Sequence, residues 1–315
     1  MLDRGAPWAE VDALVRGGVP VPSRLGDAES RARRSAAIIA VWGPAGAPGR
    51  TTLAVNLAAE IATSGHSVAL VDADPYGGAI APSLGLLDEA PGFASACRLA
   101  GGDALDRVEL ERIAQRYSAP RASFDVFTGL VGPSRWPELS RERVTAAIQA
   151  IGARSEYVVI DTGFSLERDE ELTSDQFAPR RNAATFASLA AADRVAVVGL
   201  ADPVGLSRLL RGHGDLVDLV EPVRIRTGAL GIDAHAQVRQ TLRRFAGIAD
   251  ATLLPHDGRA TDAAILTART LRDAAPRSPL RAALREYALD RILPVPQPAR
   301  RRGFVFAPMR RAAAS

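Results

Sequence analysis

A glycine-rich turn followed by two threonines is the stretch of this sequence whose residue types best suit chemistry. The stretch consists of Gly43, Pro44, Ala45, Gly46, Ala47, Pro48, Gly49, Arg50, Thr51 and Thr52. Glycines let backbone N–H groups converge on an anion, a helix starting after the turn adds partial positive charge, and a threonine hydroxyl can ligate magnesium. The pattern G-x-x-x-x-G-K-[ST] is met only in part, because Pro44 stands at its first glycine and Arg50 at its lysine. The stretch predicts a phosphate-binding loop, with an ordinary strand-to-helix turn as the alternative.

Carboxylates follow two apolar runs further along the chain. Asp72 and Asp74 follow the run 68–71, and Asp161 follows the run 157–160. Ligands of an open parallel sheet bind beyond the carboxyl ends of its strands. Phosphoryl transfer to water needs a phosphate cradle, a magnesium ion and a carboxylate that positions water. Each aspartate alone also suits a turn or a helix cap, so the prediction rests on the three segments together.

The elements that must position these residues alternate between strands and helices. An apolar run at 37–42 predicts a buried strand, and the helix over 51–63 carries Leu53, Leu57 and Ile61 at helical spacing before Gly65 ends it. Further strands are expected at 67–72, 124–129, 157–161, 194–200, 223–227 and 252–255, with helical pieces over 82–116 and helices at 138–153, 183–192, 204–220, 235–246, 260–269 and 279–292. This alternation predicts an α/β fold with a parallel, doubly wound sheet flanked by helices.

Composition limits the class of protein. Of the 315 residues, 24% are charged and 47% hydrophobic, as in ordinary globular proteins. The single cysteine excludes an intrachain disulfide and a metal cluster built on paired cysteines. No apolar run is long enough to span a bilayer, so we expect a cytoplasmic protein. We expect residues 1–35 to be a poorly ordered lead-in, 36–292 one folded domain and 293–315 a basic, disordered tail.

These motifs resemble the MinD/ParA family of P-loop ATPases over roughly residues 36–292. The family loop K-G-G-x-G-K-[ST] corresponds to residues 45–51, with Ala45 at its first lysine and Arg50 at its second. The segments D-A-D-P, V-I-D-T-G and L-P-H-D resemble its two switch segments and the segment that walls the adenine. The resemblance implies a nucleotide site built from Gly46, Ala47, Pro48, Gly49, Arg50, Thr51, Thr52 and Pro255. It also implies Mg²⁺ beside Thr51, Asp72 and Asp161, and Asp74 as the catalytic, water-positioning residue.

Two groups of arginines have alternative interpretations. Arg180 and Arg181 form either a solvated helix entry capped by Asn182 or a charge that acts on a partner subunit's nucleotide in place of Ala45. The tail arginines flank two phenylalanines and are Arg300, Arg301, Arg302, Arg310 and Arg311. They suit either a solubilising end or weak contact with an anionic membrane or DNA.

The resemblance implies an ATP- and Mg²⁺-binding switch protein that hydrolyses ATP slowly and forms a nucleotide-dependent homodimer. Such a protein would act with unidentified protein partners to position cell-division, chromosome-partitioning or pilus and secretion machinery, in the cytoplasm or at the inner face of the membrane. Within the family the motifs are most similar to actinobacterial septum-site-determining and CpaE-like proteins. The alternative is an adaptor that binds nucleotide, has lost hydrolysis and acts only through partners. ATP and another purine nucleotide both remain possible ligands at this point.

Overall fold

One eight-stranded sheet organises the chain. The computed structural model describes residues 36–46, 49–87, 92–168, 179–231 and 235–293. The strands are β1 (Ala37–Trp42), β2 (Val68–Ala73), β3 (Gln115–Ala119), β4 (Ala122–Phe127), β5 (Tyr157–Thr162), β6 (Arg194–Leu200), β7 (Ile225–Gly231) and β8 (Ala251–Pro255). Their order across the sheet is β3-β4-β2-β5-β1-β6-β7-β8, and every neighbouring pair except β3–β4 is parallel. The expected α/β fold is therefore confirmed.

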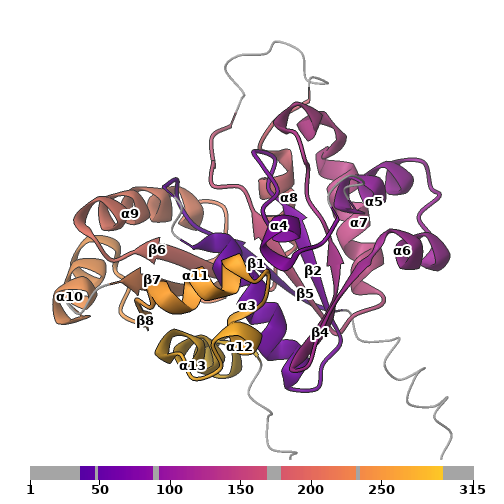
Figure 1. The fold of residues 1–315 in the computed structure, drawn as a ribbon. Coiled ribbons are helices and arrows are strands. Elements are labelled where there is room, and N and C mark those ends of the chain that lie inside the picture. Colours follow the sequence, from indigo (N-terminus) through magenta and orange to yellow (C-terminus); the bar gives the residue numbers. More distant parts are fainter. Residues whose placement is uncertain (1–35, 47–48, 88–91, 169–178, 232–234, 294–315) are drawn as a thin grey trace, which may run out of the picture.

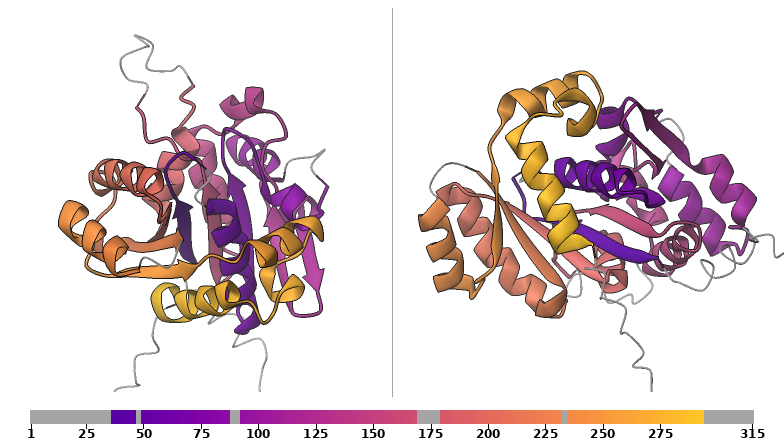
Figure 2. Two further views of the ribbon diagram at one scale, coloured as in Figure 1. Left: turned by 60° about the vertical axis from the view of Figure 1, so that its left-hand side comes forward. Right: turned by 90° about the horizontal axis from the view of Figure 1, so that it is seen from below.

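Helices cover both faces of this sheet (Figures 1 and 2). One face carries α3 (Arg50–Thr63), α12 (Leu271–Ala274), α13 (Pro279–Glu286) and the π-helical turn η4 (Tyr287–Ile292). The other carries α5 (Gly92–Gly101), α7 (Arg141–Gly152), α8 (Ala183–Ala191), α9 (Pro203–Val217) and α10 (His235–Ala246). The shorter elements are α4 (Ile80–Leu84), α6 (Arg107–Ile113), η1 (Pro133–Glu138), η3 (Pro222–Arg224) and α11 (Gly258–Leu266).

The central helix α3 follows the sequence prediction closely. Leu53, Leu57 and Ile61 are all buried, because α3 packs on β1, β2, β4 and β5. Gly65 follows the helix with φ +97°, a left-handed conformation that a residue with a Cβ adopts at a cost. This packing fixes the first turn of α3 at the carboxyl edge of the sheet, directly after the loop that follows β1.

The sheet differs from the expectation at one edge. The first two residues of β3 fall at the end of the span predicted to be helical, the rest of the strand lies where no element was expected, and β3 pairs antiparallel with β4. Tyr117 is the one fully buried residue of β3, so an edge strand of mostly polar residues gives little apolar periodicity. The predicted lead-in at 1–35 and the tail from 294 lie outside the described residues. None of the described helices is long and apolar enough to cross a membrane.

Candidate phosphate-binding site

The glycine loop joins β1 to α3 at the carboxyl edge of the sheet. Gly46 and Gly49 have φ values of +102° and +93°, which favour glycine. Gly49 occupies the N-cap position of α3, where no side chain caps the helix. An uncapped helix start with a flexible glycine backbone is suited to an anion. Ala47 and Pro48, two of the predicted loop residues, lie outside the described residues.

Thr51 and Asp161 form the closest polar contact of the site. The Thr51 hydroxyl donates to Oδ2 of Asp161 at 2.6 Å. Asp161 is 2% exposed, and its Oδ1 is buried without a hydrogen-bond partner in the described part of the chain. Burial, reinforced by the charge of Asp72, raises the pKa of Asp161 well above its usual range. A buried carboxylate with an unused oxygen next to a hydroxyl favours a bound cation.

The donor set fits Mg²⁺ and does not fit a metal held by protein alone. Within the described ranges no group of three or more His, Cys, Asp or Glu side chains could hold a metal ion. Mg²⁺ needs fewer protein ligands, because it keeps several waters and takes the oxygens of substrate phosphates. Thr51 and Asp161 are therefore the residues that would hold it together with a bound phosphate.

The carboxylate of Asp72 accepts hydrogen bonds from backbone amides. The donors are the N–H groups of Asp74 at 3.3 Å, Ala79 at 2.9 Å and Ile80 at 3.1 Å. Burial and the neighbouring carboxylate of Asp74 raise the pKa of Asp72 to about 6, although these backbone bonds oppose the rise. Asp72 is also the register partner of Asp161. These contacts hold the turn after β2 against the start of α4, and the metal role expected for Asp72 stays a prediction.

Replacing Gly129 by alanine is expected to lower the free energy of unfolding by about 1–3 kcal/mol, because there is no room for a larger residue. A Cβ on Gly129 would lie 2.5 Å from Cγ of Asp72. Gly132→Ala is the matched control, since the nearest atom to its added Cβ is 3.9 Å away. Thermal denaturation of both variants is the measurement. Equal midpoints for the two would contradict the close packing around Asp72.

Arg50 folds back onto its own loop. Its Nη1 donates to the carbonyl oxygens of Gly43 at 3.2 Å and Pro44 at 3.1 Å, and its Nη2 lies 3.7 Å from Oδ2 of Asp74. Burial raises the pKa of Asp74, while the Tyr76 amide and Arg50 oppose this. Arg50 thus ties the glycine loop to Asp74, the predicted water-positioning residue.

Two neighbouring aromatic rings lie between the turn that carries Asp74 and the start of α8. The Tyr76 ring lies 4.6 Å from the Phe164 ring, and the Arg181 guanidinium lies 4.3 Å over Tyr76. The Tyr76 hydroxyl donates to Oδ1 of Asn182 at 2.9 Å. Arg181 is therefore held against its own chain.

One interpretation of the sequence made Asn182 the cap of α8, and the structure confirms its position but not a cap bond from its side chain. The side-chain amide of Asn182 instead donates to Oγ of Ser165 at 3.2 Å and to the carbonyl oxygen of Glu167 at 2.9 Å. Sequence reasoning missed this network because the Tyr76–Asn182 bond joins residues 106 positions apart.

The remaining predicted residues lie at the same edge of the sheet. Thr52 is in the first turn of α3, and Pro255 ends β8, three strands from β1 in the sheet order. After Pro255, Asp257 accepts from the Ala260 amide at 3.1 Å and so caps α11. The structure thus brings together the described loop residues, Asp72, Asp74 and Asp161, with Pro255 further along the edge.

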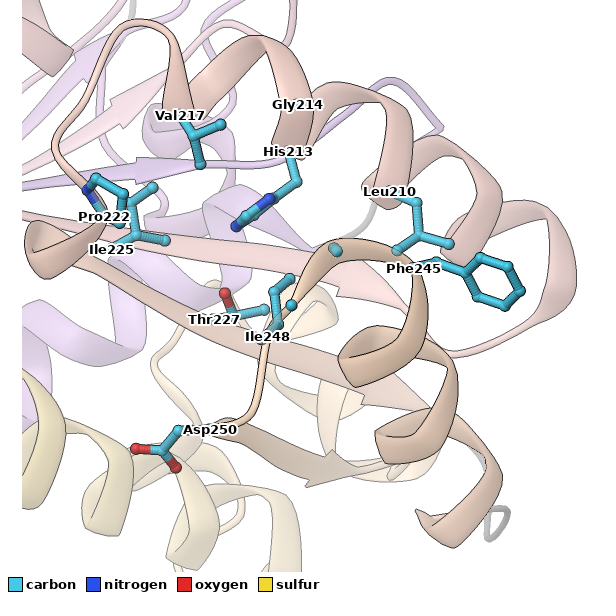
Figure 3. A pocket seen from close by; sticks show the side chains of 12 residues that line it. Leu210, His213, Gly214, Val217, Pro222, Ile225, Thr227, Phe245, Ile248 and Asp250 are labelled. Carbon is cyan, nitrogen blue, oxygen red and sulfur yellow. The ribbon is translucent and has the colours of Figure 1, made fainter.

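Two pockets lie on either side of α9. A small one of about 150 Å³ is lined by the loop residues Pro44, Ala45 and Gly46 and by the start of α9. A wider one of about 540 Å³ lies between α9, β7 and α10 and includes His213 and Phe245 (Figure 3). The wider pocket contains none of the predicted site residues, whereas the small pocket is lined by Gly46 of the predicted loop.

The sequence matches no protein-family model and no curated protein. Solved structures do match. The ParA family ATPase from Chlorobium tepidum is 19% identical, with a TM-score of 0.63, over 80% of this chain and 98% of that chain. The septum site-determining protein MinD from Pyrococcus horikoshii, solved with Mg-ADP, is 16% identical, with a TM-score of 0.59, over 80% of this chain and 94% of that chain.

A chain of the MinC:MinD cell division protein complex from Aquifex aeolicus is 15% identical, with a TM-score of 0.57, over 83% of this chain and 99% of that chain. At these identities the likeness concerns the fold. The chain therefore has the α/β fold of the MinD/ParA-type P-loop ATPases.

Proposed function

We propose that the chain is an ATP-binding switch protein that uses Mg²⁺ and hydrolyses ATP slowly. The observation that carries the proposal is the Thr51–Asp161 pair at the end of the glycine loop, with a buried carboxylate oxygen that has no partner among the described residues. The fold supports it, since the relative from Pyrococcus horikoshii was solved with Mg-ADP.

Each residue of the site has a separate task in this proposal. The backbone of residues 46–52 and the start of α3 bind the phosphates, and Thr51 with Asp161 holds the metal. Bound Mg²⁺ would neutralise phosphate charge. Asp74 orients the attacking water, Asp72 keeps the turn that carries Asp74 in place, and Pro255 walls the base.

The finer role that we propose is a nucleotide-dependent homodimer that recruits protein partners to position cellular machinery, as in septum-site-determining and CpaE-like proteins. The relatives' names support a role of this kind, because they include a septum site-determining protein and a MinC:MinD complex. In this proposal the arginines of the tail add weak contact with an anionic membrane or DNA.

A nucleotide-binding adaptor without hydrolysis is the second candidate. It is favoured by Arg50, whose guanidinium is engaged by the carbonyl oxygens of Gly43 and Pro44 and by Asp74. A guanidinium held in this way is less free to contact the negative charge that develops on a phosphate group during its transfer.

Asp74→Ala is expected to reduce phosphate release at least tenfold while ATP binding is retained, because Asp74 acts on the water and not on the nucleotide. Steady-state phosphate release with excess Mg·ATP is the measurement, and Asp125→Ala, a carboxylate on β4 paired with the exposed Arg116, is the control. Sustained release that is lost in Asp74→Ala supports the ATPase. Binding without release in the unmodified chain would instead favour the adaptor.

A further inference from the structure

Helix α9 packs directly against the end of β1 and the loop that follows it. A Cβ on Gly212 would lie 2.8 Å from Cη2 of Trp42, and one on Gly205 would lie 2.5 Å from Cβ of Leu200. Figure 1 shows the chain after β1, in indigo, running up beside α9. Glycine at these two positions of α9 lets the helix approach the carboxyl ends of β1 and β6.

Arg208 lies one helical turn before Gly212, so the two residues lie on the same face of α9. The Arg208 guanidinium rests on the glycine loop. A Cβ on Gly46 would collide with Nη1 of Arg208 and lie 3.2 Å from its Cζ. Arg208 and Gly46 also line the same pocket of about 150 Å³. That volume holds several waters, at about 30 Å³ each.

The charge of Arg208 has no counterpart in the described part of the chain. Arg208 is exposed and makes no hydrogen bond or ion pair with any described residue. Asp202 is the carboxylate that lines the same pocket, but its Oδ1 accepts from the Val204 and Gly205 amides at 2.9 Å and 2.8 Å. A free guanidinium beside a phosphate-binding backbone is suited to phosphate oxygens, which it can contact through two N–H groups.

We propose that Arg208 is a nucleotide-binding residue that contacts the phosphates of a nucleoside di- or triphosphate held by the loop. This assignment of Arg208 rests on the proposed function. It adds to that function a source of positive charge at the outer side of the loop. Ala45 carries no charge, and Arg50 is engaged by its own loop and Asp74. Arg208 supplies from α9 the charge that the loop itself does not offer.

Arg208→Ala is expected to weaken Mg·ATP binding about tenfold, because a charge-assisted contact to phosphate is lost. Arg208→Lys should recover part of the loss, since it keeps the charge but not the forked geometry. Arg211→Ala is the matched control, because Arg211 is an exposed arginine on the same helix that does not line the small pocket. Isothermal titration calorimetry of the full chain with Mg·ATP is the measurement, with thermal denaturation to verify that each variant is folded.

Three outcomes would decide the matter. Weaker binding in Arg208→Ala, partial recovery in Arg208→Lys and unchanged binding in Arg211→Ala support the assignment. Equal affinity in Arg208→Ala and the unmodified chain would overturn it and leave the proposed function intact. If the unmodified chain itself does not bind Mg·ATP, the proposed function fails first, and the role of Arg208 falls with it.

Discussion

Replacing Thr51 by alanine is expected to weaken Mg·ATP binding about thirtyfold, which corresponds to about 2 kcal/mol. The change removes the hydroxyl that would ligate Mg²⁺. It also removes the donor 2.6 Å from Oδ2 of Asp161, a carboxylate that is 2% exposed and already has one unpartnered oxygen. Calorimetric titration with ATP at fixed Mg²⁺ measures the loss.

Two controls separate metal binding from packing at this position. Thr51→Ser keeps the hydroxyl and should bind Mg·ATP nearly as well as the unmodified chain. In a chelating buffer the difference between Thr51→Ala and the unmodified chain should shrink, because no metal is present to be held. Equal affinities of Thr51→Ala and the unmodified chain in Mg²⁺ would show that the threonine takes no part in the site.

Replacing Glu60 by alanine is expected to lower the free energy of unfolding by about 3 kcal/mol. Glu60 is 3% exposed on α3, and it accepts from Nε of Arg281 at 2.7 Å, from Nη2 of Arg281 at 2.9 Å and from Nη1 of Arg272 at 3.0 Å. Its loss leaves two largely covered guanidinium groups without their carboxylate. Those groups belong to α12 and α13, so the variant also weakens the attachment of these helices to α3.

Urea denaturation at equilibrium measures this effect. The control is Glu286→Ala, an exposed glutamate at the end of α13, for which we expect a change of about 0.5 kcal/mol or less. A Glu60→Ala variant with the same unfolding midpoint as the control would mean that the buried ion pairs contribute no net stability.

Helix α3 illustrates what could be predicted from the sequence and what could not. The apolar spacing of Leu53, Leu57 and Ile61 and the position of Gly65 predicted its buried face and its end, because both signals are local. Asn56 and Glu60 are polar residues of the same helix, yet both are buried. Apart from a bond of Asn56 to the Thr52 carbonyl oxygen, their partners lie in 271–281, more than 200 positions away, and no periodicity in α3 could indicate them.

In the candidate site, too, some features could be predicted from the sequence and others could not. Residue types and order predicted that the glycine loop and the carboxylates at the carboxyl ends of β2 and β5 would share one edge, since parallel strands end there together. The bonds that Asp72 makes, and the stacking of Arg181 on Tyr76, come from contacts between distant segments. Arg208 gave no signal in the sequence, because its relation to Gly46 depends on how closely α9 packs on β1.

The most direct test of the account is a calorimetric titration of ATP into the full chain, with and without Mg²⁺. The glycine loop, the Thr51 hydroxyl and the unpartnered oxygen of Asp161 predict saturable binding that is tighter in Mg²⁺ than in a chelating buffer. Absence of binding at millimolar ATP in the presence of Mg²⁺ would contradict the account and leave the loop after β1 as an ordinary strand-to-helix turn.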